Sequence, residues 1–324
     1  MLVHRERCPS CASLKHRIWG PALYPHDFMP LWGLYDNGKL AAYQDLFKNL
    51  IPNGIHLSKC DNCSMIFAES IPNEELANVI YNDLLGDEAI SYARSKRQDK
   101  RYLVCRISRL LFDLAKYSQG KIENLRVLDF GCGWGDVMEA MAFLGTQVQG
   151  IEVSRQKRAH VESLGLSVAS VLSEAKVAPP YDVILLWQVL EHVQEPFSTL
   201  EMLRSVAHKN TVLFVGVPHF TEQRLRQEFR KSPSARSKDL NPLEHLNYFD
   251  GHTLTQVARN AGWRRLYTMQ PILDGPMILP QNREVRSMGS SLWRNVRFAL
   301  TYFNPRSRNI ALGTYIACTP ETRF

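Results

Sequence analysis

The chain has 324 residues, and with roughly 150 residues in a typical domain we expect about two structural units. Hydrophobic residues make up 45% and charged residues 22%, an ordinary globular composition that excludes wholesale disorder, collagen and coiled coil. The net charge of +7 bears on partners rather than on fold, so nucleic acid, a membrane surface and an anionic substrate all stay open.

The compartment is inferred from apolar runs and cysteines. No stretch approaches the roughly 18 uninterrupted apolar residues of a membrane span, and the first residues lack the apolar core of a secretory signal. We therefore expect a cytoplasmic protein, whose thiols stay reduced. An odd count of 7 cysteines then favours metal binding or packing over disulfides.

Two Cys-x-x-Cys pairs lie within residues 1–80: Cys8 with Cys11, and Cys60 with Cys63. Together they offer the four thiolates that tetrahedral zinc takes and leave no open position, so we expect a structural zinc in a zinc-ribbon-like module. The 48 residues between the pairs exceed the usual spacing, and an aromatic-rich insertion is expected to loop out of the ribbon. The alternatives are reduced cysteines in ordinary turns and, less favoured, a redox pair.

The following elements are predicted from hydrophobic periodicity. Residues 81–124 form a connecting segment, in which apolar residues at spacings of three and four predict a helix over 89–118. From 125 to 324, apolar strands alternate with helical patterns, which predicts an α/β fold with a parallel sheet. Strands are expected at 126–130, 148–151, 182–186, 211–217, 264–269 and 314–318, a weak strand at 167–171, and helices at 136–144, 155–164, 196–207 and 252–261. The polar, basic segment 220–242 is expected to be a loop or a lid, and 274–309 has no clear period.

The strongest local signal is a glycine loop, Arg126-Val-Leu-Asp-Phe-Gly-Cys-Gly-Trp-Gly135. Glycine permits a sharp turn and close approach of a ligand to the main chain, and open α/β sheets bind ligands at the carboxyl ends of their strands. The next strand ends in Glu152, 23 residues after Asp129, close to the roughly 20 expected for an acid that bonds ribose hydroxyls. The pair predicts a nucleotide-like cofactor; the alternative is a tight turn without a ligand.

This loop resembles motif I of the class I S-adenosylmethionine-dependent methyltransferases, Asp-x-Gly-x-Gly-x-Gly. The likeness continues in Pro180-Tyr-Asp-Val-Ile-Leu-Leu-Trp-Gln-Val-Leu-Glu-His-Val193 and in Glu244-His-Leu-Asn-Tyr-Phe249. Their order is similar to that of a subgroup of small-molecule methyltransferases, sugar methyltransferases among them, that carry an N-terminal module of Cys-x-x-Cys pairs. Two features depart from the pattern: His208-Lys-Asn210 replaces a usual Gly-Gly, and no acid or amide is obvious near Ser170–Glu174.

The resemblance implies a Rossmann-like sheet with helices on both faces and S-adenosylmethionine as cofactor. In this family the first loop holds the cofactor's amino-acid part, the acid ending the second strand bonds the ribose, and its neighbour lies beside the adenine. The backbone after the fourth strand lines the cofactor. The implied binding residues are Asp129, Gly131, Gly133, Glu152, Val153, Trp187 and Gln188.

Methyl transfer from a sulfonium donor depends mainly on positioning, but an oxygen or carbon acceptor also needs a base for its proton. His192, His219 and His245 are the candidates, since histidine titrates near physiological pH. We favour His245, because Glu244 and Tyr248 accompany it after the expected lid. Each candidate has a structural alternative: a backbone bond in a turn for His192, a satisfied loop histidine for His219, and a helix cap or a fixed loop around His245.

Charge is concentrated late in the chain, because residues 220–324 hold 16 basic and 8 acidic residues. This excess is either a solvated face or a docking surface for an anionic acceptor. We expect a small-molecule acceptor, namely a sugar, a nucleotide-linked sugar or a glycan, and hence a role in carbohydrate biosynthesis. An RNA methyltransferase is the alternative, although no Asn-Pro-Pro-Tyr-like motif follows the fourth strand. A non-catalytic interaction protein is disfavoured by the intact Asp129, glycines and Glu152.

Overall fold

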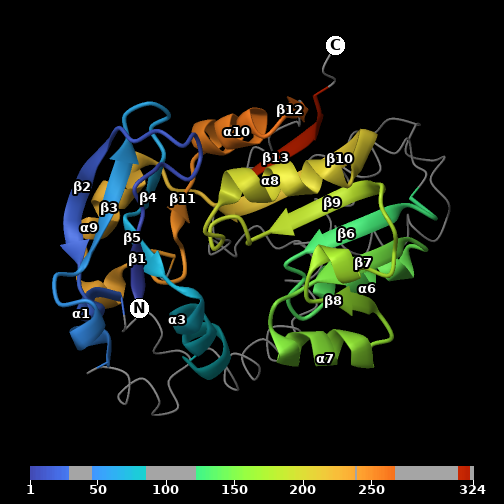
Figure 1. Ribbon diagram of the computed structural model, residues 1–324, viewed down its shortest axis with the longest axis horizontal. Coiled ribbons are helices and arrows are strands. Elements are labelled where there is room, and N and C mark those ends of the chain that lie inside the picture. Colours follow the sequence, from blue (N-terminus) through green and yellow to red (C-terminus); the bar gives the residue numbers. More distant parts are fainter. Residues whose placement is uncertain (29–45, 85–121, 238, 267–312, 322–324) are drawn as a thin grey trace, which may run out of the picture. The chain divides into compact units, whose positions relative to one another are not determined.

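The computed structural model describes residues 1–28, 46–84, 122–237, 239–266 and 313–321 (Figure 1). The predicted helix over 89–118 and the segment 274–309 lie outside these residues. The chain forms two compact units, one of Met1–Ala93, Leu186–Arg265 and Leu312–Phe324, the other of Arg94–Leu185 and Leu266–Ala311. The first unit thus combines distant parts of the sequence, and the domain boundaries 1–80, 81–124 and 125–324 stay predictions.

The N-terminal part of the first unit is built from short antiparallel strands. Strand β1 (Leu2–His4) pairs with β5 (Ser70–Pro72). A four-stranded sheet has the order β11-β4-β3-β2. Its strands are β2 (His16–Leu23), β3 (Ile55–Cys60), β4 (Ile66–Ala68) and β11 (Asn247–Tyr248). The accompanying helices are α1 (Pro25–Phe28), α3 (Glu74–Asn78) and the π-helical turn η2 (Val79–Leu84).

The insertion between the cysteine pairs is not looped out in its described part, so that expectation was wrong. Strand β2 begins soon after Cys11, β3 ends at Cys60, and the two strands pair with His16 opposite Cys60. Trp19 and Leu23 on β2 are buried, while Gly20 and Pro21 between them are exposed where the pairing with β3 shifts in register. The described residues between the pairs therefore contribute two strands to the sheet itself.

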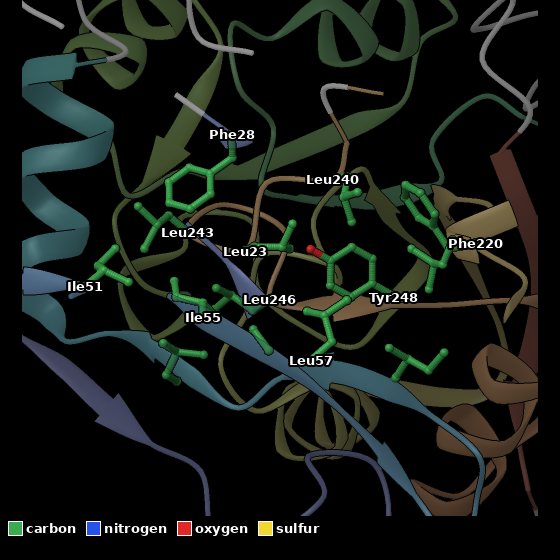
Figure 2. Packing of buried hydrophobic residues seen from close by; sticks show 14 of the residues in the cluster. Leu23, Phe28, Ile51, Ile55, Leu57, Phe220, Leu240, Leu243, Leu246 and Tyr248 are labelled. Atoms are coloured by element: carbon green, nitrogen blue, oxygen red, sulfur yellow. The ribbon is translucent and has the colours of Figure 1, made fainter. Parts of the chain in front are cut away.

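One hydrophobic core joins this sheet to residues much later in the chain. Figure 2 shows Leu23, Ile55 and Leu57 from β2 and β3 packed among Leu240, Leu243, Leu246 and Tyr248. Phe220 meets Tyr248 edge to face, with ring centroids 5.3 Å apart. Residues 220–248 thus supply about a third of the buried residues in the core on which the N-terminal strands fold.

Segment 220–242 contains helix α9 (Glu222–Phe229) and the short 3-10 turn η4 (Pro233–Ala235), so the predicted loop or lid was wrong over these residues. The Thr221 side chain caps α9 by accepting a hydrogen bond from the Arg224 amide. Leu225 is buried, and the Phe229 ring packs on Trp19 at a centroid distance of 5.8 Å. Helix α9 is mostly polar and has only a narrow apolar stripe, so its composition resembles that of a loop although the stripe packs on the core.

The larger sheet has seven strands in the order β12-β13-β10-β9-β6-β7-β8. Strands β6, β7, β8 and β9 run parallel, with Asp129 of β6 opposite Gly150 of β7 and Leu185 of β9. Their bounds are Arg126–Phe130, Gln147–Ile151, Ser167–Ala169 and Tyr181–Trp187. The helical elements among them are α6 (Asp136–Phe143), α7 (Arg155–Ser163) and η3 (Leu172–Glu174). The predicted α/β fold is confirmed.

The other strands of this sheet and the helices near them in sequence belong to the first unit, apart from Leu266 at the end of β12. They are α8 (Pro196–Ser205), β10 (Ala207–Pro218), α10 (Gly251–Asn260), β12 (Trp263–Leu266) and β13 (Gly313–Pro320). Strand β13 pairs antiparallel with β10, so the sheet is mixed rather than wholly parallel. A capping box between Asp250 and Thr253 begins α10. Across the described part of the chain, no helix is both long and apolar enough to cross a lipid bilayer.

Candidate functional site

The glycine loop follows β6 as a tight turn anchored to β7. Gly131, Gly133 and Gly135 all have positive φ, between 57° and 83°, a conformation that other residues adopt only with strain. The Gly131 and Cys132 amides both donate to the Ile151 carbonyl, at 2.7 and 3.0 Å. Among the described residues other than its chain neighbours, no atom lies within 4 Å of a Cβ built on Gly133, whereas one on Gly150 would overlap the Cys132 sulfur at 2.7 Å. The loop is therefore closely packed on β7 but open at Gly133.

Glu152 holds the open part of this loop. Its Oε2 accepts a hydrogen bond from the Gly133 amide at 3.0 Å, and its Oε1 accepts one from the Ser154 amide at 2.8 Å. The side chain is 7% exposed, so its orientation is fixed. A carboxylate oxygen has two lone pairs, so each oxygen can accept a second hydrogen bond. Asp129 at the end of β6 is also buried, and Val153 is 79% exposed beside Glu152.

Trp187 ends strand β9, and Gln188 follows it. Gln188 has a φ of 57°, uncommon for a residue other than glycine, and its amide donates to the Gly216 carbonyl at 2.7 Å. A Cβ on Gly216 would lie 3.0 Å from the Trp187 ring, so the indole packs flat on β10 at that glycine. Such local backbone strain is typical of functional sites.

His192 and His245 lie together with Glu191, within the first unit. The two imidazole rings meet edge to face, with centroids 4.6 Å apart. The ligand atoms of the three side chains lie within 4.8 Å of one another, and His192 Nε2 is 3.8 Å from Glu191 Oε1. The chain brings the cluster together because the Leu246 and Asn247 amides both donate to the Glu191 carbonyl.

His192 is held in one ring orientation. Its Nδ1 lies 2.8 Å from the Glu244 carbonyl and 3.3 Å from the Tyr81 hydroxyl. A carbonyl only accepts, so Nδ1 carries the proton and donates it, which leaves the lone pair on Nε2. His192 therefore presents Nε2 as a proton acceptor when its ring is neutral.

Burial shifts the protonation of the other two groups in opposite directions. Glu191 is 1% exposed, and neither of its carboxylate oxygens has a hydrogen-bond partner among the described residues. Burial raises the pKa of Glu191 to about 8 and lowers the pKa of His245 to about 4. His245 keeps some exposure, but its Nδ1 is buried and lacks a partner within the described ranges. Near neutral pH, a protonated Glu191 and a neutral His245 are the favoured forms.

The pKa of Glu191 predicts a pH-dependent stability. The unfolded carboxyl loses its proton near pH 4.5, but the folded one keeps it up to about pH 8, so this group's stabilising contribution is lost as the pH rises between these values. We expect Glu191→Gln to gain stability relative to the unaltered chain between pH 5 and 8, by about 1.4 kcal/mol per pH unit. Urea unfolding at several pH values measures the difference.

The exposed neighbour Glu195 provides the control for this measurement. Glu195→Gln is expected to leave the pH dependence unchanged. The free energies of unfolding of Glu191→Gln and of the unaltered chain could instead keep a constant difference from pH 5 to 8. That result would contradict a proton held on Glu191.

The third candidate base, His219, follows β10 and is not part of this cluster. Desolvation lowers its pKa, with nearby Arg224 acting the same way and Asp250 opposing it. Its carbonyl accepts a hydrogen bond from Arg224. Tyr248 is buried, which raises the pKa of its phenol. Glu244 accepts a hydrogen bond from Asn241 at 2.9 Å, so its side chain fixes the loop.

Sequence reasoning missed Tyr81 and Arg5 and did not place Glu191 among the catalytic candidates. Tyr81 contacts His192, and Arg5 is buried against the same turn. Neither residue belongs to a motif, so the sequence carries no signal for them. Glu191 directly precedes His192, and an acid next to a candidate base was the sequence signal that could have identified it.

The four paired cysteines form one cluster. All their Sγ atoms lie within 4.8 Å of one another, with Cys8 3.5 Å from Cys63 and Cys11 3.6 Å from Cys60. Tetrahedral zinc with bonds of about 2.3 Å places its sulfurs about 3.8 Å apart, so the spacing fits. Ala12 and Ser64, each directly after a pair, both have positive φ, so the two turns are alike. The Cys8 thiol lowers the pKa of Cys63 to about 5.

Comparisons with known proteins agree with this geometry. Residues 95–267 match the family described as methyltransferase domain. The ubiquinone biosynthesis O-methyltransferase of Actinobacillus pleuropneumoniae serotype 5b (strain L20) is 34% identical over 160 residues, covering 41% of this chain and 68% of that protein. The enzyme of the same name from Serratia proteamaculans (strain 568) is 30% identical over 145 residues, covering 42% and 59%.

Solved structures show the same fold. The plantazolicin methyltransferase BamL, in complex with a triazolic desmethylPZN analog and SAH, has a TM-score of 0.51 and 16% identity, and the match covers 75% of this chain and 94% of that one. The plantazolicin methyltransferase BpumL, with the same kind of analog and SAH, has a TM-score of 0.52 and 14% identity, covering 76% and 95%. At these identities the likeness concerns the fold alone.

The glycine loop, the parallel strands around it and the relatives in sequence define an S-adenosylmethionine-dependent methyltransferase. Since the matching residues 95–267 make up more than half of its length, the chain belongs to the methyltransferase domain family. The recognised class and the Rossmann-like fold are thereby confirmed.

Proposed function

We propose that the protein transfers the methyl group of S-adenosylmethionine to a hydroxyl oxygen of a small-molecule acceptor. The observation that carries this is the tautomer of His192, whose Nδ1 donates to the Glu244 carbonyl, so that the ring's basic lone pair lies on Nε2. An oxygen acceptor needs such a base, whereas a more nucleophilic acceptor does not. The relatives' name, O-methyltransferase, agrees with an oxygen acceptor.

The cofactor site is proposed from the second unit's glycine loop and Glu152. The bound cofactor supplies a methyl group activated by its sulfonium charge. Gly131 and Gly133 let the main chain approach it, and the preorganised Glu152 oxygens accept the ribose hydroxyls. Asp129, buried at the strand end, is proposed beside the amino-acid part, and the exposed Val153 beside the adenine. For Trp187 and Gln188, which belong to the first unit, a place beside the cofactor stays a prediction from the family resemblance.

His192 is proposed as the base in preference to His245. The low pKa of His245 makes its ring a weak proton acceptor, and its Nδ1 is buried. Once His192 Nε2 has taken the acceptor's proton, the imidazolium lies 3.8 Å from Glu191 Oε1, whose partial negative charge stabilises it while the carboxyl keeps its own proton. His245, packed on the His192 ring, is proposed to hold it in place.

The acceptor hydroxyl is proposed to belong to a sugar or a nucleotide-linked sugar, since the cysteine module resembles that of sugar methyltransferases. A phenolic hydroxyl is the second candidate, because the relatives are named for ubiquinone biosynthesis. The basic segment gives little support to an anionic acceptor. Four of its described cations are paired within the protein: Arg224 with Asp239, Arg226 with Glu222, Lys231 with Glu228 and Arg236 with Asp27.

Methyl-labelled S-adenosylmethionine offered with UDP-glucose, dTDP-glucose, catechol or total RNA tests this proposal. We expect label in a sugar nucleotide. Label in catechol would select the second candidate, and label in RNA alone would overturn a small-molecule acceptor. Analysis of the labelled product identifies the atom that carries the methyl group. An N-methyl or C-methyl product would contradict a hydroxyl acceptor.

We also propose that Cys8, Cys11, Cys60 and Cys63 hold one structural zinc ion. The thiolate set, the sulfur spacing and the two matching turns support it. Elemental analysis of purified protein is expected to give about one zinc per chain. Cys60→Ser should lose the metal and lower the melting temperature, because such sites contribute to folding. Cys318→Ser, at a buried cysteine outside the cluster, is the control that should keep the zinc.

A further inference from the structure

We propose that Arg5 and Asn247 are positioning residues that hold His192 in its reactive orientation, so that the N-terminal segment completes the acceptor side of the enzyme. This inference rests on the proposed role of His192 as the base. It concerns residues of the first unit only.

Arg5 connects the chain's start to both segments of the histidine cluster. It lies directly after β1 and is 6% exposed. Its Nη2 donates to the Gln194 carbonyl, in the turn that carries His192. Its Nη1 donates to the Leu246 carbonyl at 3.3 Å and to the Asn247 Oδ1 at 3.1 Å, next to His245. One planar group thus fixes the spacing of two turns.

Asn247 closes the arrangement from the other side. Its Nδ2 donates to the Leu190 carbonyl at 3.2 Å and to the Val193 carbonyl at 2.7 Å, one on each side of Glu191 and His192. Its Oδ1 accepts from Arg5. The amide therefore uses donor and acceptor ends together, and each end touches a different segment. Strand β11, to which it belongs, pairs with β4 of the cysteine-bearing sheet.

Stability alone does not account for a guanidinium at this position. Burial lowers the pKa of Arg5 to about 10, and its Nε has no hydrogen-bond partner in the described part of the chain. A buried charge is costly, and an apolar side chain of similar length would fill the same space without that cost. Hydrogen bonds to three acceptors give geometric precision instead. The acceptors lie on the two turns that bear His192 and His245.

The test uses Arg5→Lys, which keeps the charge but loses the planar fork, with Arg7→Lys at an exposed arginine as the control. Protein with ¹⁵N-labelled histidine rings is used, and His192→Gln assigns the His192 signal. We expect Arg5→Lys to move the His192 nitrogen shifts from a single tautomer toward averaged values, while Arg7→Lys leaves them unchanged. Calorimetry should give the same affinity for S-adenosylmethionine in both variants.

Methyl transfer provides the second measurement, with the most active acceptor of the UDP-glucose, dTDP-glucose and catechol set. Arg5→Lys should lower kcat about 10-fold or more while KM for the cofactor stays unchanged. Unchanged His192 shifts in Arg5→Lys would overturn the inference even if no acceptor is turned over. Asn247→Ser is the second variant if Arg5→Lys fails to fold, and the same shift is expected there. Full activity in His192→Gln would instead overturn the proposed base, whatever the Arg5 variants do.

Discussion

Replacing Glu152 with alanine is expected to weaken S-adenosylmethionine binding about 100-fold or more. The change removes a carboxylate placed to accept two ribose hydroxyls, and hydrogen bonds to a charged group contribute about 1.5–3 kcal/mol each. It also removes the acceptor of the Gly133 and Ser154 amides, so the open part of the glycine loop loses its support. Isothermal calorimetry with the cofactor measures the loss.

Glu162→Ala on α7 is the matched control, since it removes an exposed carboxylate from the same unit. It should bind the cofactor like the unaltered protein. Glu152→Gln separates the two roles, because an amide oxygen can still accept from one backbone amide but no longer provides two charged acceptors. An unchanged affinity of Glu152→Ala for S-adenosylmethionine would contradict the proposed contact between Glu152 and the ribose.

Replacing His192 with glutamine is expected to lower kcat about 10²- to 10⁴-fold, the range that a general base contributes, while cofactor affinity stays within about twofold. Glutamine fills similar space and can still donate toward the Glu244 carbonyl, but it supplies no basic nitrogen. Steady-state kinetics with labelled cofactor measures kcat, and calorimetry measures the affinity. The loss of kcat should persist across the pH range, since the glutamine side chain does not titrate and so supplies no base at any pH.

His245→Gln distinguishes the two neighbouring histidines. With a pKa of about 4, His245 gains little by accepting a proton near neutrality, so we expect a smaller loss than for His192→Gln. Exposed His252, on α10, provides the control, and His252→Gln should be fully active. A larger loss in His245→Gln than in His192→Gln would return the role of base to His245, as the sequence alone had favoured.

Much of the larger sheet could be predicted because its signals are local. Strand β6 has the expected bounds, and β7 begins only one residue earlier than expected, since each carries branched apolar residues and is ended by a local signal, the glycine loop or Glu152. Helix α9 was missed because arginines and glutamates dominate its composition, and only Leu225 and Phe229 mark its packed face. Strand β11 has two residues and no periodicity to detect.

The candidate site was predictable only as far as motifs reach. The four cysteines were expected together, and the structure places them together. His192 and His245 were each singled out, but their contact depends on the pairing of the Leu246 and Asn247 amides with Glu191, which no local pattern reveals. Arg5 is a single basic residue near the start of the chain, and its contacts at Gln194 and Leu246 depend wholly on tertiary structure.

Strand β11 is translated long after the other strands of its sheet, which affects folding during synthesis on the ribosome. The sheet that carries both cysteine pairs keeps an open edge at β4 until residues 247 and 248 have emerged and paired with it. Until then Leu57 and its neighbours also lack the leucines of 240–246 that cover them. A nascent chain stopped near residue 80 should therefore expose an unpaired strand edge and apolar surface, both of which attract chaperones and promote aggregation.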